Sequence, residues 1–495
     1  MKKILLILVA VLLCGMLSSC GEKTMVGETV SPDANGDGYI TSDEADLRGV
    51  VVQYMEDMAS IEWTAGPLID YTAEGFSKLV YEPGQKYYGM VYNATYTGME
   101  NFLKALDETK TYVSEETAWD RCPGNSCATS IEHAWQIISP TVEYAYSADM
   151  MPYYVNTNVT AIGNIAWNTY NGSNTTKSIL KNTDKNDVME AYALMQPGDS
   201  LVRYLDTGGH ALMLTEEVLV VRDSSGKILP AKSYLYLTDQ NSTLNNDREY
   251  PSSWKVDDAV NFTQAYMDGY LPVSCKELQE GKMPVPEFEL TDGPTEQALE
   301  MSTLNGVITS NYNIMTVRAE ITKGKNVVAS ASYHPYAKEV NLDVVSPELK
   351  MWELPNGKYT LTVVVEAGLG SQTILQMKYK KVDTEDLAKK YNDDSLVQLE
   401  LLDASTVEDL ESSNIRGTVN CNYSMLTIRI EILNADGEVA DSLEVKPCAK
   451  TYLLDKVSQD LAMWELPAGD YTVDIQVETG VGFQSIMKQE YTKAS

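Results

Sequence analysis

Two stretches of sequence, PGNSCATSIEHAWQII at residues 123–138 and QPGDSLVRYLDTGGHALML at residues 196–214, decide the fold of the middle of this chain. The first carries apolar residues at helical spacing directly after Cys127, which predicts a helix with a thiol in its first turn. The second has a glycine pair before His210 and an apolar run, which predicts a strand with an imidazole at its head. Helical and strand-like runs mix without an obvious break over residues 61–286. This pattern predicts one α+β domain.

Cys127 and His210 are the residue types of a thiol hydrolase. A thiol at a helix N-terminus faces the positive end of the helix dipole and free N–H groups, which lower its pKa toward the thiolate. A histidine at the head of a buried strand can serve that thiol as general base. The rival base, His133, lies more than a turn beyond Cys127 in the same helix. The alternatives are a core histidine and a Cys127 that packs in the core or bonds to Cys122.

A general base of this kind needs a third polar group that fixes its tautomer. The next strand, SYLYLTDQN at residues 233–241, ends with Asp239 and Gln240. Neighbours in a strand face opposite ways, so only one of the two can point at His210. The alternation of the apolar residues favours Asp239, and Gln240 stays open.

Composition and the N-terminus place the protein outside the cytoplasm. The 495 residues carry a formal net charge of −33, which argues against nucleic acid as a partner. Two lysines and an apolar run precede Leu-Ser-Ser-Cys at residues 17–20, which resembles the lipobox of bacterial lipoproteins. We therefore expect residues 1–20 to be a signal peptide and Cys20 to carry the lipid that anchors the chain at the outer membrane or cell surface. Five cysteines remain beyond Cys20, an odd number that leaves at least one thiol free.

The segment DANGDGYITSDE at residues 33–44 matches a calcium loop. A helix is predicted after this loop but not before it, so residues 21–60 resemble half of a dockerin. Dockerins pair two such loops, and only one is visible in this sequence. We therefore favour a structural calcium ion over binding to a cohesin. Ile40 is expected to pair with a partner loop. No cofactor is expected for catalysis. The predicted calcium ligands are Asp33, Asn35, Asp37, the carbonyl of Tyr39, Thr41 and Glu44.

The remainder of the chain is an internal repeat. LNGVITSNYNIMTVRAEI from Leu304 matches IRGTVNCNYSMLTIRIEI from Ile415, and MWELPNGKYTLTVVVEAG from Met351 matches MWELPAGDYTVDIQVETG from Met463. Alternating short strands with Gly and Asn turns predict two all-β sandwiches of immunoglobulin or fibronectin type, at residues 287–383 and 396–495.

Two cysteines distinguish the second copy from the first. Cys421 and Cys448 stand where the first copy has Ser310 and Tyr336. Two thiols added together to one copy predict a disulfide between them. Cys122 can then pair with Cys275, which leaves Cys127 free, or with Cys127, which removes the nucleophile.

The order of these motifs resembles the NlpC family of papain-like cell-wall peptidases. In that family LQPGD precedes a Gly-His strand, much as Gln196-Pro197-Gly198-Asp199 precedes Gly209-His210 here. The likeness covers roughly residues 80–245. It implies a papain-like α+β domain that cleaves amide bonds in peptidoglycan stem peptides, with Tyr88 of Lys86-Tyr87-Tyr88-Gly89 beside the thiol as a substrate contact. The chain departs from the family at Ser126-Cys127-Ala128-Thr129, where Asp-Cys-Ser-Gly is usual.

Two functions are compatible with the sequence. The first is a surface-anchored cysteine hydrolase with Cys127, His210 and a polar third residue. The second is a non-enzymatic, calcium-stabilised binding or adhesion lipoprotein, in which the peptidase fold is degenerate and the sandwiches bind a surface glycan or protein.

Overall fold

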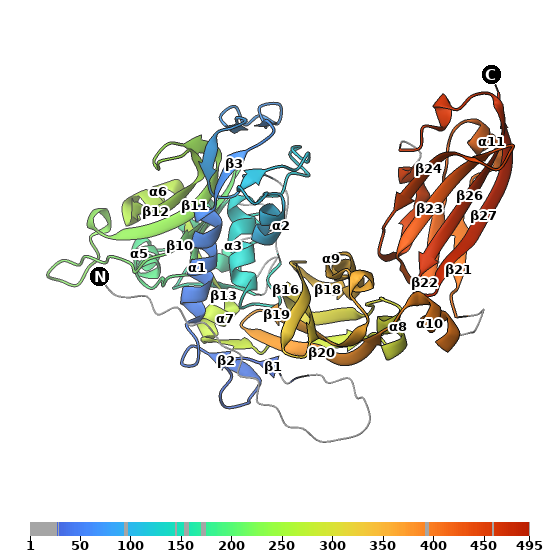
Figure 1. The fold of residues 1–495 in the computed structure, drawn as a ribbon. Coiled ribbons are helices and arrows are strands. Elements are labelled where there is room, and N and C mark those ends of the chain that lie inside the picture. Colours follow the sequence, from blue (N-terminus) through green and yellow to red (C-terminus); the bar gives the residue numbers. More distant parts are fainter. Residues whose placement is uncertain are drawn as a thin grey trace.

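The computed structural model describes residues 27, 29–93, 98–143, 146–152, 158–169, 175–391, 396–457 and 460–494. The predicted signal peptide and lipidation site at Cys20 lie outside the described residues. Three parts follow one another along the chain: an α+β domain, a sandwich called repeat 1 (residues 287–383) and a sandwich called repeat 2 (residues 396–494) (Figure 1). Repeat 2 extends from repeat 1 and stands away from the α+β domain. Within the described ranges, no helix is long and apolar enough to cross a membrane.

A nine-stranded sheet forms the centre of the α+β domain, in the order β7-β3-β6-β12-β11-β10-β9-β13-β8. The central strands β9 (Ser200–Leu205), β10 (Gly208–Leu214) and β11 (Tyr234–Asn245) are antiparallel. The sheet is completed by β3 (Glu62–Ala65), β6 (Lys86–Tyr88), β7 (Thr111–Tyr112), β8 (Val159–Ala161), β12 (Ser252–Asn261) and β13 (Leu271–Cys275), while β4 (Ile69–Asp70) pairs with β5 (Val80–Tyr81).

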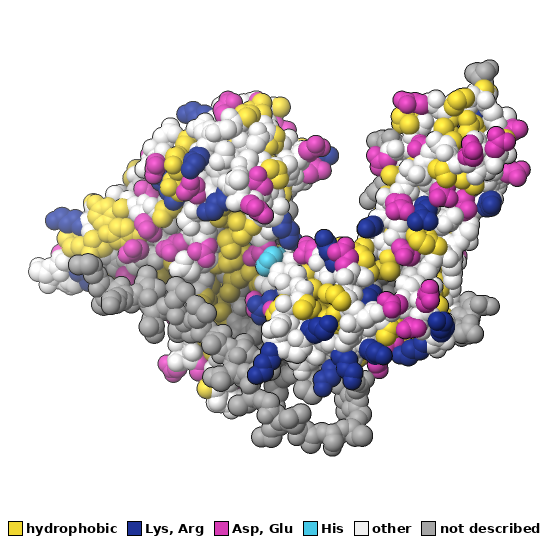
Figure 2. Space-filling model, viewed as in Figure 1, with side chains coloured by type: hydrophobic (Ala, Val, Ile, Leu, Met, Phe, Trp, Pro, Cys, Tyr) yellow, Lys and Arg dark blue, Asp and Glu magenta, His cyan; other side chains and the backbone are white. Residues whose placement is uncertain are grey.

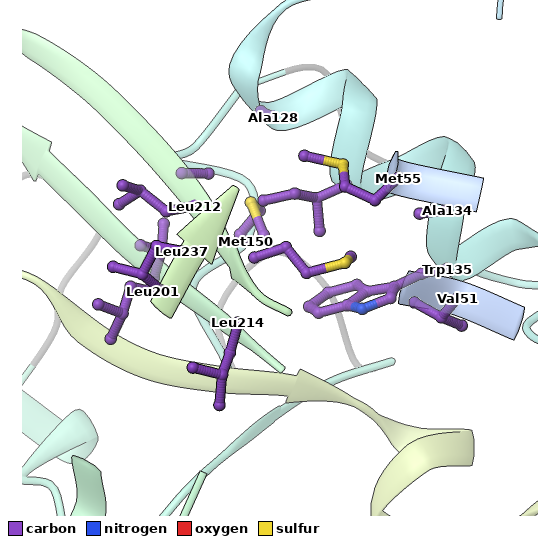
Figure 3. Close-up of a cluster of buried hydrophobic side chains, with 14 of the residues drawn as sticks. Val51, Met55, Ala128, Ala134, Trp135, Met150, Leu201, Leu212, Leu214 and Leu237 are labelled. Atoms are coloured by element: carbon purple, nitrogen blue, oxygen red, sulfur yellow. The ribbon is translucent and has the colours of Figure 1, made fainter. Parts of the chain in front are cut away.

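Two helices bury their apolar faces on this sheet. Figure 3 shows Trp135 of α3 (Cys127–Gln136) beside Val51 of α1 (Leu47–Ser60), with the leucines of the central strands facing these helices. Every residue of α3 from Cys127 to Trp135 is buried, so this helix lies in the core. The other helices of the domain are α2 (Gly98–Lys104), α4 (Thr176–Asn182), α5 (Lys185–Ala193), α6 (Phe262–Asp268) and α7 (Lys276–Glu280).

The predicted calcium loop is joined to the α+β domain instead of forming a separate N-terminal unit. Strand β2 (Tyr39–Thr41) pairs with β14 (Lys282–Pro284), which places Ile40 opposite Met283. Ile40 therefore pairs within its own chain and not with a second loop. Helix α1 contributes Val51, Met55 and Met58 to the core of the domain. The reason is apolar burial, since the helix after the loop has an apolar face that the sheet covers.

The Pro-Gly-Asp turn before β9 connects the helices to the sheet. The Asp199 carboxylate is buried, forms an ion pair with Arg48 of α1 at 3.0 Å and accepts a hydrogen bond from Ser274 Oγ of β13 at 2.6 Å. Trp135 Nε1 donates to the Gly198 carbonyl at 2.8 Å. Gly198 has φ +89°, a conformation that side chains disfavour. The motif thus has a structural role next to the candidate site.

Both repeats are β-sandwiches, which confirms that part of the sequence prediction. In repeat 1, the first half of β16 pairs with β15 and β18 and its second half pairs with β17 and β19, so one strand serves both layers. The strands are β15 (Phe288–Thr291), β16 (Val307–Lys323), β17 (Asn326–Tyr333), β18 (Ala337–Asn341), β19 (Gly357–Ala367) and β20 (Gly370–Lys381), and β1 (Thr29–Val30) pairs with β20. Short helices α8 (Glu296–Glu300), α9 (Ser346–Leu349) and α10 (Thr384–Lys390) accompany them.

In repeat 2 the two layers are separate sheets. One contains β21 (Leu399–Leu402), β22 (Thr418–Met425) and β25 (Ala449–Leu453), and the other β23 (Thr427–Asn434), β24 (Val439–Val445), β26 (Gly469–Thr479) and β27 (Gly482–Lys493). Helix α11 (Val407–Glu411) lies between β21 and β22 in the sequence. Asp and Glu side chains are spread over the visible face of all three parts, as the acidic composition requires (Figure 2).

The predicted disulfides are absent. All five described cysteines are free thiols, so neither Cys421–Cys448 nor any bond of Cys122 to Cys275 or Cys127 is formed. Cys421 packs into the core of repeat 2, whereas the Cys448 thiol donates to the Lys446 carbonyl at 3.5 Å. The two side chains therefore have different surroundings, although Cys448 directly precedes β25, the strand that pairs with β22 of Cys421.

The buried ion pair makes a prediction about stability. Replacing Arg48 by Met removes the cation that faces a carboxylate only 1% exposed. We expect the free energy of unfolding of the α+β domain to fall by about 3–5 kcal/mol, measured by urea unfolding with tryptophan fluorescence. The control is Lys255→Met, which breaks a pair with Asp258 whose side chains are 44% and 48% exposed and should cost less than about 1 kcal/mol. Equal losses from both variants would contradict this account.

Candidate active site

The start of α3 holds Cys127 in the first turn, as predicted from the sequence. Ser126 is the N-cap and forms a capping box with Thr129: the Ser126 N–H donates to Thr129 Oγ1 at 2.7 Å, and the Thr129 N–H donates to Ser126 Oγ at 3.4 Å. Such caps fix the entry of a helix. The N–H groups of Cys127 and Ala128, ahead of the capped Thr129 N–H, have no carbonyl partner within the helix and can face an anion.

His210 and Asp239 lie beside this thiol. His210 is at the head of β10, and its Nε2 is 2.9 Å from Asp239 Oδ2 on β11. Asn241 Nδ2 also donates to Asp239 Oδ2. The Cys127 thiol and the His210 ring are close enough for each to shift the pKa of the other. A helix and two adjacent strands thus bring Cys127, His210 and Asp239 together.

Gln240, the alternative third residue, points elsewhere. Its Oε1 accepts from Ser130 Oγ of α3 at 3.0 Å, and its Nε2 donates to the Met90 carbonyl at 2.9 Å. Gln240 is fully buried and binds α3 to the sheet. Because consecutive strand residues face opposite sides, Asp239 is the residue that faces His210.

The pKa values of the thiol and the imidazole depend on each other. Burial raises the pKa of the Cys127 thiol, but the charge of His210, its hydrogen bond and the N–H of Ala211 outweigh burial, so the net pKa is lowered. Burial lowers the pKa of His210, but the Cys127 and Asp239 charges and hydrogen bonds raise it to about 10. Both shifts favour a thiolate–imidazolium pair near neutral pH.

His133, the rival base, is at the other end of α3. Its ring contacts Tyr336 of repeat 1 in an edge-to-face arrangement with centroids 4.6 Å apart. Burial lowers its pKa to about 4. His133 is six residues beyond the thiol along the helix, so it is not placed to serve as its base. Its ring forms part of the contact between α3 and repeat 1.

Tyr88 does not lie where the family likeness implies. Its ring stacks with Tyr250 at 5.2 Å and lies under the guanidinium of Arg248 at 4.1 Å. Strand β6 ends at Tyr88, and the chain reaches the site only at Tyr92, which lines the same cleft as Cys127. Tyr92 thus takes the position expected of Tyr88, and it lies outside the segment Lys86-Tyr87-Tyr88-Gly89 on which the likeness was based.

A cleft of about 390 Å³ opens over the thiol. Its described lining is aromatic and neutral polar, which suits an uncharged backbone such as a peptide. A larger hollow of about 630 Å³ lies elsewhere and contains none of the three residues of the site. The cleft is lined by Tyr92, Asn93, Trp119, Ser126, Cys127, Ala128, Thr129, Tyr146, Ser147, Ala148, Tyr204 and Gly209. Apart from Ser126, Cys127, Ala128, Thr129 and Gly209, these residues carried no sequence signal, because they come from loops and strand ends.

The predicted calcium loop contains oxygen donors of the type that calcium prefers. However, Asp33 accepts from the N–H groups of Gly36 and Gly38, and Glu44 accepts from those of Ala34 and Thr41. The bonds from Thr41 and Ala34 lower the pKa of Glu44. In the part of the chain that the structure describes, no group of three acidic, histidine or cysteine side chains is placed to hold a metal ion. The donors fit calcium chemically, but their carboxylates do not converge.

Comparisons with known proteins give partial likenesses. No family model matches the chain, and no curated protein matches it. A tetra-tandem repeat from the extending region of a large adhesion protein has 12% identity and a TM-score of 0.16, covering 60% of this chain and 66% of its own. The BSP domain of a biofilm-associated protein has 13% identity and a TM-score of 0.16, covering 58% and 48%. The FN1–FN3 domains of chicken CNTN1 have 8% identity and a TM-score of 0.15, covering 60% and 89%. The chain thus spans less than two thirds of the first two structures, and at these TM-scores the likenesses carry no argument.

The electrostatics of the site predict the pH dependence of alkylation. Because the pKa of Cys127 is lowered, iodoacetamide should modify it well below about pH 8, where a thiol of ordinary pKa is mostly protonated, and reactivity should be lost as pH falls through the lowered pKa. Asp239→Ala should lower the His210 pKa, which the Asp239 hydrogen bond and charge raise, so the imidazolium that accompanies the thiolate should be lost at a lower pH than in the wild type. Peptide mapping by mass spectrometry measures the Cys127 alkylation profile of both proteins. Cys122 is the internal control, since burial raises its pKa. A Cys127 profile like that of an ordinary thiol would contradict the coupling.

Proposed function

We propose that this protein is a cysteine hydrolase that cleaves amide bonds outside the cytoplasm, with a papain-like α+β domain of NlpC type. The observation that carries the proposal is the cluster of Cys127, His210 and Asp239, in which Cys127 lines the cleft and His210 Nε2 is 2.9 Å from Asp239 Oδ2. A thiol at a helix N-terminus, paired with a histidine that a carboxylate orients, is the arrangement that nucleophilic catalysis requires.

The arrangement supports a two-step reaction. The Cys127 thiolate attacks the amide carbonyl and forms a C–S bond, and the carbonyl oxygen becomes an oxyanion at the first N–H groups of α3. The His210 imidazolium donates its proton to the leaving amine as the C–N bond breaks. Water then attacks the thioester, His210 takes its proton, and the thiolate leaves. Asp239 keeps the His210 ring oriented throughout the cycle and stabilises the imidazolium form whenever the ring is protonated.

Two considerations support peptidoglycan stem peptides as the substrate. The first is the likeness of the Pro-Gly-Asp and Gly-His motifs to those of cell-wall peptidases. The second is the aromatic and neutral polar lining of the cleft, which suits a peptide backbone. Anchorage by a lipid on Cys20, at the outer membrane or cell surface, would keep the enzyme at the cell wall.

Surface binding or adhesion is the second candidate function. It is favoured by the two sandwiches, of which repeat 2 stands away from the α+β domain (Figure 1). Solved structures named for adhesion and biofilm proteins are in keeping with it, although they carry no weight as evidence. In this alternative the sandwiches bind a surface glycan or protein and the cysteine site is inactive. The two candidates differ in whether Cys127 turns over a substrate.

Activity on purified wall fragments decides between them. Cys127→Ala and His210→Ala should each reduce amide hydrolysis by at least about 10³-fold, since each removes an essential part of the nucleophile. His133→Gln and Cys448→Ala, which change a histidine and a thiol away from the cleft, should retain activity. New amino and carboxyl termini, detected by mass spectrometry, are the readout. Undiminished cleavage by Cys127→Ala would refute the mechanism, and no cleavage by the wild type would favour the binding protein.

We also propose that the loop at residues 33–44 binds one calcium ion, supported by its match to the calcium-loop pattern. Calorimetry on the full chain should give a dissociation constant of roughly 10⁻⁴ to 10⁻³ M, because the loop lacks an entering helix. The double variant Asp37→Ala, Glu44→Ala should lose the heat, whereas Asp436→Ala, in an acidic turn of repeat 2, should keep it. Equal heats of calcium binding from the wild type and the double variant would rule out a calcium site in this loop.

A further inference from the structure

Arg203 differs from the other arginines of this acidic chain in its partners. Arg248 donates to the carbonyl of Ala59. Among the described residues, the Arg203 guanidinium lies over the ring of Tyr270, 4.8 Å from its centroid, and Arg203 Nε is buried without a hydrogen-bond partner. The arginines that pair with carboxylates are Arg48, Arg121, Arg222, Arg318, Arg416 and Arg429.

This cation lies next to the candidate active site. Arg203 on β9 is directly opposite His210 on β10 in the antiparallel register, so the two side chains share one face of the sheet. The Tyr270 ring, on which the guanidinium lies, is 6.4 Å from the His210 ring. The next pair in the register, Tyr204 and Gly209, lines the cleft from the opposite face of these strands, so Arg203 lies on the His210 side of the site.

No carboxylate of the described residues forms an ion pair with Arg203, although Asp239 and Asp268 act on the same Tyr270 ring as Arg203 does. The nearest carboxylate of the site, Asp239, is shared by His210 and Asn241. The undescribed segments around the domain, at residues 94–97, 144–145, 153–157 and 170–174, contain no Asp or Glu. A partly buried cation without a counter-ion is costly, and one beside a nucleophile is placed to meet an anionic ligand.

We propose that Arg203 binds a carboxylate of the substrate next to the amide under attack. This inference rests on the proposed hydrolase function and narrows its substrates to peptides with a free carboxylate beside the cleaved bond. The planar guanidinium pairs with a carboxylate through two parallel N–H donors. Stacking on Tyr270 holds the guanidinium flat and leaves its edge for that pairing. Arg203 is therefore a specificity residue.

The test compares two alkylating reagents of nearly equal shape. Iodoacetate carries a carboxylate where iodoacetamide carries an amide, and with each the Cys127 thiolate forms a C–S bond as iodide leaves. In the full-length protein, Arg203→Gln should lower the ratio of the iodoacetate rate to the iodoacetamide rate by about tenfold, and the ratio cancels any change in thiolate reactivity that both reagents share. Arg203→Lys, which retains the charge, should restore most of the ratio. Arg248→Gln is the matched control, since Arg248 also stacks on a tyrosine but away from the cleft.

A second measurement needs only the wild type. N-acetylglycine should slow the reaction of Cys127 with iodoacetamide more than N-acetylglycinamide does. An unchanged reagent ratio in Arg203→Gln, or equal protection by the acid and the amide, would overturn the role of Arg203 and leave the hydrolase proposal standing. A Cys127 that reacts with neither reagent would overturn the hydrolase proposal and this inference together.

Discussion

The burial of helix α3 against the nine-stranded sheet is the interaction on which the rest of this protein depends. Nine consecutive residues of the helix are buried, so its polar groups need partners inside the core. Ser130 Oγ donates a hydrogen bond to Gln240 Oε1, and Trp135 Nε1 donates one to the Gly198 carbonyl. These bonds set the position of the helix on the sheet, and with it the position of Cys127 relative to His210. A shift of the helix would leave these polar groups unsatisfied, which is more costly than the loss of apolar contact alone.

The burial that positions Cys127 and His210 also disfavours the charged forms that catalysis requires. A thiol and an imidazole in a dry environment each favour their neutral forms, and burial is the largest influence on both pKa values. The charged pair is sustained because each partner stabilises the other and Asp239 stabilises the imidazolium. Asp239 is in turn held by Asn241. The reactivity of Cys127 therefore belongs to the group as a whole and not to the helix N-terminus alone.

The two repeats differ where they contact different neighbours. Tyr336 of repeat 1 donates to the His133 carbonyl and to Gln136 Oε1, and so contacts the C-terminal end of α3. Its counterpart in repeat 2 is Cys448, and both residues have a positive φ, 48° and 50°. Repeat 2 contacts repeat 1 instead, where the Ser424 N–H donates to Thr303 Oγ1 at 2.8 Å. The replacement of Tyr336 by Cys448 in the second copy thus accompanies a change in the part of the protein that each repeat contacts. The presence of Cys448 was therefore misleading evidence for a disulfide.

The sequence by itself determined the elements: a helix that begins at Cys127, a strand headed by His210, and two copies of a β-sandwich. These follow from local periodicity, capping and repetition, which act over a few residues. Strand alternation also favoured Asp239 over Gln240. Only the tertiary structure decided that Tyr92 and not Tyr88 reaches the thiol, that α1 belongs to the core, that Ile40 pairs with Met283, and that Arg203 faces His210. Each of these depends on register and packing between segments far apart in the chain, and such contacts have no local pattern in the sequence.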